Sequence, residues 1–137
     1  MVQSVSSSPA RRLVFLAKTD ADVAVPAAGN TNLLDMDVSQ LARIALEIKN
    51  TGANAFDAFI VQGKVHVDGA FVTILSVAAD YTTPAGIVVD ASGDLTILAA
   101  GTTGWLILDA LSFIAIRLQA SANVAGATTA SVLAGGS

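Results

Sequence analysis

Residues 43–49 alternate strictly between apolar and polar or small side chains, and no other feature of the sequence constrains the fold as much. Ile44, Leu46 and Ile48 occupy the even positions, and Arg43 and Lys49 stand at the two ends. Successive side chains of a β-strand point to opposite faces, so this spacing predicts a strand with one buried face and one solvent-facing side. The chain is therefore expected to fold as β-sheet.

A helix over residues 39–49 is the competing interpretation of the same stretch. Ser39 is a suitable N-cap for such a helix. Leu41, Ile44 and Ile48 also fit helical spacing. However, the β-branched side chains at positions 44 and 48 lose rotamer freedom in a helix, and the Asn-Thr-Gly sequence that follows is typical of a turn. Both observations favour the strand.

Similar short apolar segments, separated by Gly, Pro, Asn and Asp, recur along the chain. Strands are predicted at residues 11–18, 33–38, 43–49, 56–67, 71–78, 87–89, 95–98, 105–108 and 113–120, with a short piece at 23–25 and a final strand near 128–133. Turn residues thus fall roughly every eight to twelve positions, which is the spacing of a β-sandwich. The expected fold class is an all-β antiparallel β-sandwich of about nine strands, with jelly-roll or immunoglobulin-like topology.

Three local features are predicted from the positions of glycine. Asp68 and Gly69 are expected to form a tight hairpin turn, because both tolerate positive φ. Gly63 is expected to mark a β-bulge in the strand 56–67. The C-terminal residues 135–137, Gly-Gly-Ser, are expected to form a flexible tip.

The chain of 137 residues has the length of one domain. Its first ten residues are rich in serine and include Pro9, which cannot donate a backbone hydrogen bond to a strand ladder. We therefore expect a flexible N-terminal arm at residues 1–10 and a single β-sandwich domain at residues 11–137. The lack of cysteine excludes disulfides, thiolate metal ligands and a cysteine nucleophile.

Charge and hydropathy argue against two classes of partner. The sequence has 7 Lys and Arg against 11 Asp and Glu, a net charge of -4, and its one adjacent basic pair is Arg11 and Arg12. Nucleic-acid binding requires clustered basic residues that neutralise phosphates, so no nucleic-acid partner is expected. The longest uncharged run, 118–137, contains too many polar residues for a membrane helix. Residues 1–10 lack the basic and apolar regions of a secretory signal peptide.

Groups that carry catalysis are scarce. The one histidine, His66, lies on a predicted solvent-facing side of a strand, and no serine stands in a Gly-x-Ser-x-Gly elbow. Three spaced pairs of aspartates are the remaining candidates, for a calcium site: 20 with 22, 35 with 37, and 90 with 94. None fits the twelve-residue calcium loop, and loop aspartates ordinarily accept backbone hydrogen bonds. The sequence therefore predicts no enzyme activity, no metal and no cofactor.

Five segments occur in an order that resembles a known class of proteins. They are RIALEIKNTG at 43–52, FDAF at 56–59, DG at 68–69 with FVTIL at 71–75, GWLILD at 104–109, and IRLQA at 116–120. In this pattern, between residues 42 and 134, the chain resembles small β-sandwich structural proteins of tailed-bacteriophage virions, which decorate or cement capsids or lie at the head-tail region. The resemblance implies a virion component that is usually oligomeric, has a jelly-roll or immunoglobulin-like fold and carries no catalytic residues.

The composition agrees with a protein whose outside is partly covered by other subunits. Hydrophobic residues make up 53% of the chain and charged residues 13%, whereas about a quarter of the residues of an average globular domain are charged. We therefore expect a capsid decoration or cement protein that buries apolar surface across capsomer junctions. Its expected partners are the major capsid protein or other virion proteins, and further copies of itself in a dimer or trimer. It is expected to be made in the host cytoplasm, without a signal peptide, and to reside in the virion.

The residues expected to contact these partners lie in or near the arm and at predicted loop tips: Val2, Val5, Pro9, Arg11, Arg12, Asp57, Tyr81, Pro84, Thr102 and Thr103. Two alternative functions remain open. One is another phage structural role, as a tail, adaptor or fibre-associated protein. The other is a carbohydrate-binding module in which Trp105 or Tyr81 stacks on a sugar ring, although the apolar run that begins at Trp105 favours a packing role.

Overall fold

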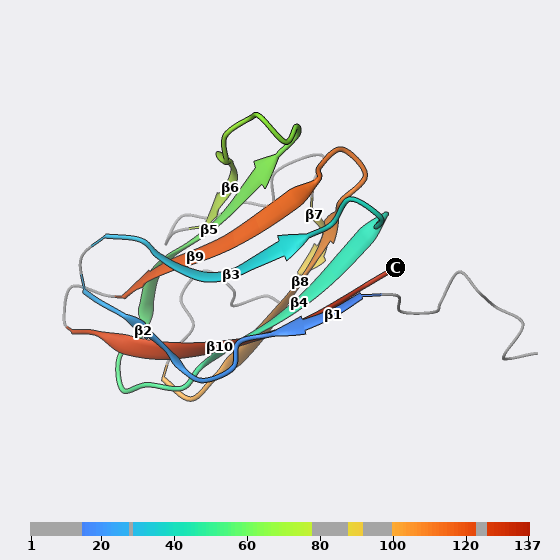
Figure 1. The fold of residues 1–137 in the computed structure, drawn as a ribbon. Helices are drawn as coiled ribbons and strands as arrows, with labels where there is room; N and C mark the ends of the chain where they lie inside the picture. The colour runs from blue at the N-terminus through green and yellow to red at the C-terminus, as the bar shows by residue number, and fades with distance from the viewer. Residues whose placement is uncertain (1–14, 28, 78–87, 92–99, 123–125) are drawn as a thin grey trace, which may run out of the picture.

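Two antiparallel sheets pack face to face in the computed structural model, which describes residues 15–27, 29–77, 88–91, 100–122 and 126–137 (Figure 1). The ten strands in these ranges are β1 (Phe15–Lys18), β2 (Val23–Val25), β3 (Thr31–Asp37), β4 (Arg43–Asn50), β5 (Phe56–Lys64), β6 (Val72–Val77), β7 (Val88–Ala91), β8 (Thr103–Asp109), β9 (Ala115–Ala122) and β10 (Thr128–Gly136). One sheet has the order β1-β10-β4-β8-β7, with β2 also paired to β10, and the other has the order β3-β9-β5-β6. The predicted all-β antiparallel sandwich is confirmed. No helix in the described ranges is long and apolar enough to cross a membrane.

The strand pairing identifies the jelly roll among the two topologies that the sequence predicts. β1 and β2 follow one another along β10, so they act as a single interrupted edge strand. Counted in this way the pairs are nested: the first strand pairs with the last, β3 with β9, β4 with β8, and β5 with β6. Such nesting is one long antiparallel hairpin folded over on itself, which is the jelly-roll arrangement. β7 is an additional strand on the outer edge of β8.

Every strand in the described ranges coincides with a predicted segment. The count is ten because the predicted short piece at 23–25 and the predicted final strand, β2 and β10, both form ladders. The predicted strand at residues 95–98 and the predicted arm at residues 1–10 lie outside the described residues.

Inward side chains of both sheets form the core. In β4, Ile44, Leu46 and Ile48 are buried while Arg43 and Lys49 are exposed, as the alternation predicts. The largest fully buried side chains are Phe56, Phe59, Ile44, Leu46, Ile48, Leu106, Leu108, Ile116, Leu118 and Val25. They come from both layers, so burial of these two facing sets is what holds the sheets together.

The helical alternative for residues 39–49 is wrong. Ser39 belongs to the turn after β3, where its backbone N and its Oγ donate to Asp37 Oδ1 at 3.0 and 2.7 Å. Leu41 N then donates to the carbonyl of Val38 at 2.9 Å. The serine therefore caps a turn, and the next residues pair with β10 and β8.

The hairpin between β5 and β6 forms where predicted, but its turn has another geometry. Gly69 N donates to the carbonyl of His66 at 2.9 Å, and Asp68 N donates to His66 Nδ1 at 3.0 Å. Neither Asp68 nor Gly69 has positive φ, so the expected tight turn on these two residues is wrong. The turn closes one position earlier because His66 supplies both acceptors, and β5 ends at Lys64 rather than at position 67.

Gly63 does not form the predicted bulge. The irregularity in the β5-β6 ladder falls between Val61 and Gln62, and Gly63 pairs regularly with Val72. A Cβ on Gly63 would lie 2.6 Å from two ring atoms of Phe113. Glycine is needed here because it lets the Phe113 ring cover the end of β5.

The C-terminal residues do not form the predicted flexible tip. β10 continues to Gly136, which is buried. Ser137 N donates to the carbonyl of Arg43 at 3.1 Å, and the Ser137 carbonyl accepts from Ala42 N and Arg43 N. A Cβ on Gly136 would lie 2.7 Å from Leu41 Cδ1 and 2.9 Å from the Arg43 carbonyl oxygen. Gly136 is therefore required for close approach of the chain end to β4.

Candidate interaction surfaces

The outer face of the β3-β9-β5-β6 sheet is polar, and we call it the polar face. Its outward residues include Asn32, Asp35, Ile60, Gln62, Thr73, Ser76, Arg117 and Gln119. Arg117 Nε and Nη2 donate to the two carboxylate oxygens of Asp35 at 2.8 and 3.1 Å, and this hydrogen bonding raises the pKa of Arg117. The guanidinium carbon lies 3.9 Å from the centre of the Phe71 ring. Polar groups on this face are thus largely engaged with one another.

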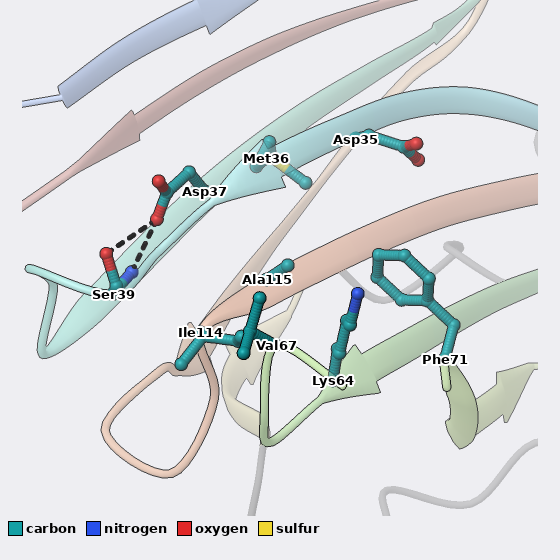
Figure 2. Close-up of a pocket in the computed structure, with 9 residues that line it drawn as sticks. All are labelled: Asp35, Met36, Asp37, Ser39, Lys64, Val67, Phe71, Ile114 and Ala115. Atoms are coloured by element: carbon teal, nitrogen blue, oxygen red, sulfur yellow. Dashed lines mark hydrogen bonds between the residues drawn. The ribbon is translucent and has the colours of Figure 1, made fainter. Parts of the chain in front are cut away.

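A hollow lies at one end of the polar face, and Figure 2 shows Asp37 and Lys64 on its opposite sides. Ser39 donates two hydrogen bonds to the Asp37 carboxylate, and these lower the pKa of Asp37, the side-chain bond contributing most. The Lys64 ammonium lies 5.7 Å from the centre of the Phe71 ring. The hollow is therefore lined by two carboxylates, of Asp35 and Asp37, and one ammonium, of Lys64. No group of three or more acidic or histidine side chains that could hold a metal ion occurs among the residues described.

The outer face of the other sheet is apolar, and we call it the apolar face. It is defined by Leu16 on β1, Leu133 and Gly135 on β10, Ala45 on β4, and Trp105 and Ile107 on β8. The side chains of Leu16, Leu133 and Trp105 are 76%, 51% and 41% exposed. Adjacent large apolar side chains on a protein surface mark sites of interaction more often than a single exposed one does. The apolar face is therefore the main candidate for a contact surface.

Two neighbouring rows across the strands give the apolar face its shape. One row is Leu16, Gly135, Ala45 and Ile107, and the next is Lys18, Leu133, Glu47 and Trp105. Because glycine and alanine occupy the middle of the first row, the sheet is hollowed there over about 420 Å³. Leu133 and Trp105 border this hollow. The second row also places opposite charges, Lys18 and Glu47, on either side of Leu133.

A second apolar surface, which we call the hairpin end, lies where the β5-β6 and β8-β9 loops meet. It consists of Val65, Val67, Val72 and Leu111, whose exposed fractions are 67%, 69%, 62% and 73%. Ile114 N donates to the Lys64 carbonyl at 2.8 Å and so joins the two loops. The hairpin end and the apolar face together contain all the large hydrophobic side chains that the described residues expose.

Three of the ten predicted contact residues lie within the described ranges, and all three are exposed at the end of the sandwich opposite the hairpin end. Thr102 accepts a hydrogen bond from Asn50 N through its carbonyl at 3.0 Å. Thr103 begins β8 and pairs with Lys49. Asp57 lies inside β5 in the other sheet rather than at a loop tip. The remaining predicted residues, Val2, Val5, Pro9, Arg11, Arg12, Tyr81 and Pro84, lie outside the described ranges.

Trp105 and His66, two of the side chains that the sequence analysis weighed for binding or chemistry, both lie on the surface. His66 is an exposed turn residue whose Nδ1 accepts the Asp68 amide. Trp105 points outward from β8 while Leu106 points into the core. The indole is bordered by apolar side chains and Glu47, so it enlarges the apolar face.

Sequence reasoning missed Leu133, Leu111 and the valines of the hairpin end. The sequence did indicate that Leu16 lies on a contact surface, because the segment 13–17 carries apolar residues at both odd and even positions. A strand with two apolar faces is covered on both sides. The same signal was available for β10, where Val132 is buried and the next residue, Leu133, is exposed.

Comparison with known proteins adds little to this geometry. No protein-family model matches the chain, and no curated protein matches it. Among solved structures, the crystal structure of the SPBc2 prophage-derived protein YomS superimposes with a TM-score of 0.45 at 8% sequence identity, over 89% of this chain and 96% of that chain. A likeness at this level carries no conclusion about function.

Proposed function

We propose that this chain is a structural, non-enzymatic protein of a tailed-phage virion, of the capsid decoration or cement type. The observation that carries the proposal is the apolar face, which leaves Leu16, Leu133 and Trp105 exposed around one hollow. Burial of such a surface against another subunit stabilises the assembly by about 25 cal/mol per Å² of apolar area removed from water. The phage assignment is supported by the order of segments between residues 43 and 120.

The role is mechanical in this proposal. A decoration protein resists separation of shell subunits because pulling them apart would expose buried apolar area to water. The sandwich offers two surfaces for such contacts, the apolar face and the hairpin end. The major capsid protein and further copies of this chain are the proposed partners, and the two surfaces can have different occupants. The polar face, whose charges are paired within the chain, is the side left toward solvent.

Mass spectrometry of purified particles tests the virion assignment. Tailed-phage particles would be purified from a culture of the organism whose genome encodes this chain. The expected result is that the chain is present in a copy number comparable to that of the major shell protein. Copy numbers of a single ring overturn the decoration role in favour of a tail or adaptor role, and particles without the chain overturn the proposal as a whole.

A pair of variants then tests the surface. Leu133→Asp places a charge at the centre of the apolar face, and Ser76→Asp places one on the exposed edge of the polar face as a matched control. Each purified variant would be added to particles stripped of the native protein and sedimented with them. We expect at least a tenfold loss of particle binding for Leu133→Asp only, since burying an unpaired carboxylate is costly. Equal binding of both variants would contradict a role for the apolar face.

A further inference from the structure

We propose that the part of the apolar face on β1, β10 and β4 is covered by the same part of a second copy of this chain, related by a two-fold axis parallel to β10. The inference rests on the proposed function only in treating the apolar face as a contact surface. It adds the occupant and the register of the contact, and its test requires no phage particle.

Charge order on the two flanking strands supports a second copy as the occupant. The strand β1 carries Lys18, and Asp20 follows it two residues later; on β4, Glu47 is followed two residues later by Lys49. Thr19 N donates to the Val132 carbonyl at 3.0 Å, so the chain still runs beside β10 as it approaches Asp20. The two strands thus present charges in opposite order, on either side of β10.

A two-fold axis along β10 places β1 of each copy over β4 of the other. Lys18 pairs in register with Leu133, and Leu133 with Glu47, so Lys18 and Glu47 share one row at equal distances from β10. Rotation about this axis keeps the row and exchanges its two sides. Lys18 of one copy then faces Glu47 of the second copy, and Asp20 faces Lys49. One rotation makes two pairs of opposite charge, each twice, as an isologous interface requires.

The same rotation also matches large side chains to small ones. Leu16 and Ala45 lie in one row, on opposite sides of Gly135. The axis therefore sets Leu16 of one copy over Ala45 of the other, where the sheet is hollowed. Leu133 meets its own counterpart across the axis. The two copies of β10 run parallel across this axis, so the two leucines pack against one another between aligned sheets.

Within one chain, Lys18 and Glu47 do not compensate each other. They are separated by β10, hence by two strand spacings or about 10 Å. Neither forms an ion pair with another residue in the described ranges. Charges that stand beside exposed apolar side chains, as Lys18 and Glu47 stand beside Leu133, discourage non-specific association and favour a partner with the complementary pattern. The second copy provides that pattern.

The contact area of the proposed dimer determines how tightly the two copies are expected to bind. With the axis on β10, the facing strands are β1, β10 and β4, or about 10 to 15 Å across and about 20 Å along the strands, and β8 with Trp105 lies outside the contact. Two facing copies would bury on the order of 500 Å² in total, which is at the weak end of protein interfaces. We therefore expect a dissociation constant in the micromolar range, low enough for a dimer to form at the high local concentration of an assembling particle.

Sedimentation velocity of the purified full chain tests this inference. Wild type, Lys18→Glu, Glu47→Lys and the double variant would be compared at about 100 μM, where a contact of micromolar affinity is nearly saturated. Each single reversal puts two like-charged pairs into the dimer, so we expect at least tenfold weaker dimerisation. The double variant restores opposite charges and is expected to regain most of the lost affinity. Far-UV circular dichroism verifies that all four proteins are folded.

A monomeric wild type at this concentration overturns the second-copy proposal while leaving incorporation into particles to its own test. Dimers of equal strength in all four proteins would show that self-association uses another surface, and would overturn it too. If both single variants dissociate and the double variant does not recover, the proposed register is wrong. A wild type that is monomeric alone but sediments with particles through Leu133 would show that the occupant is a different protein.

Discussion

A single buried side chain, Asn50, organises the end of the sandwich opposite the hairpin end. Its Nδ2 donates to the Asn54 carbonyl at 2.8 Å, and its Oδ1 accepts from Thr128 Oγ1 at 2.7 Å and from Gly52 N at 3.2 Å. These bonds tie the turn after β4 to the start of β10. Asn50 and Thr128 are two of three buried polar residues in the described ranges. Buried polar groups of this kind are costly to leave without partners.

We expect Asn50→Ala to lower the free energy of unfolding by about 2 to 4 kcal/mol. The substitution removes the hydrogen-bond partner of the buried Thr128 hydroxyl, the Asn54 carbonyl and the Gly52 amide. Urea denaturation followed by Trp105 fluorescence measures the loss. Asn32→Ala is the matched control, since Asn32 bonds to Gln119 on the exposed polar face; its loss should stay below about 1 kcal/mol. Similar losses for both variants would refute a structural role for the Asn50 network.

At the scale of elements, the strands with strict alternation were predictable and those without it were not bounded correctly. β4 and β9 place a polar residue at nearly every outward position, so the inward face of both follows from the sequence; the bounds of β4 were predicted to within one residue, whereas β9 begins and ends two residues later than predicted. In β10, Gly135 and Gly136 predict an irregular end by themselves. They form a strand because the chain end lies against residues 41–43, so closely that glycine is required at position 136. This is a long-range contact that no local pattern encodes.

The contact surfaces were less predictable than the strands. Alternation assigns Leu133 and Val132 to opposite faces but does not tell which face is inward when both are apolar. That choice depends on the register with β4 and β1, which come from distant parts of the chain. The predicted contact residue Asp57 was placed in a loop because a turn precedes it, whereas the ladder already begins at Phe56.

The substitution Gly136→Ala tests the close approach at the end of β10. The new Cβ would overlap Leu41 Cδ1 and the Arg43 carbonyl, and the second of these is backbone that cannot rotate away. We expect a loss of about 1 to 3 kcal/mol in the free energy of unfolding, as for other overpacked sites. Ser131→Ala, at a partly exposed outward position of the same strand, should change it by less than about 0.5 kcal/mol. A neutral Gly136→Ala would mean that the chain end is free to shift.

For the whole molecule, the important property is the difference between its two outer faces. Both sheets have an alternating inner side, and together these inner sides build the core. Outward, one sheet pairs Arg117 with Asp35 and Gln119 with Asn32, while the other exposes Leu16, Leu133 and Trp105. The two faces therefore differ in their exposed hydrophobic side chains, which on the second sheet stand among the charged residues of β1 and β4. Of the two outer faces, only this one would gain from leaving water, which is why the proposed association uses it.

Association through that face makes stability depend on protein concentration, by mass action. If unfolding also separates two copies, each tenfold increase in concentration above the dissociation constant should raise Tm by about 2 °C for a chain of this length. Differential scanning calorimetry between about 20 and 200 μM covers the range in which a micromolar dimer is populated. Leu133→Asp should remove the dependence, because its monomers unfold independently, and Ser76→Asp should retain it. A wild-type Tm that is constant over this range would show that the protein unfolds as a monomer, and would contradict a second copy as the partner of the apolar face.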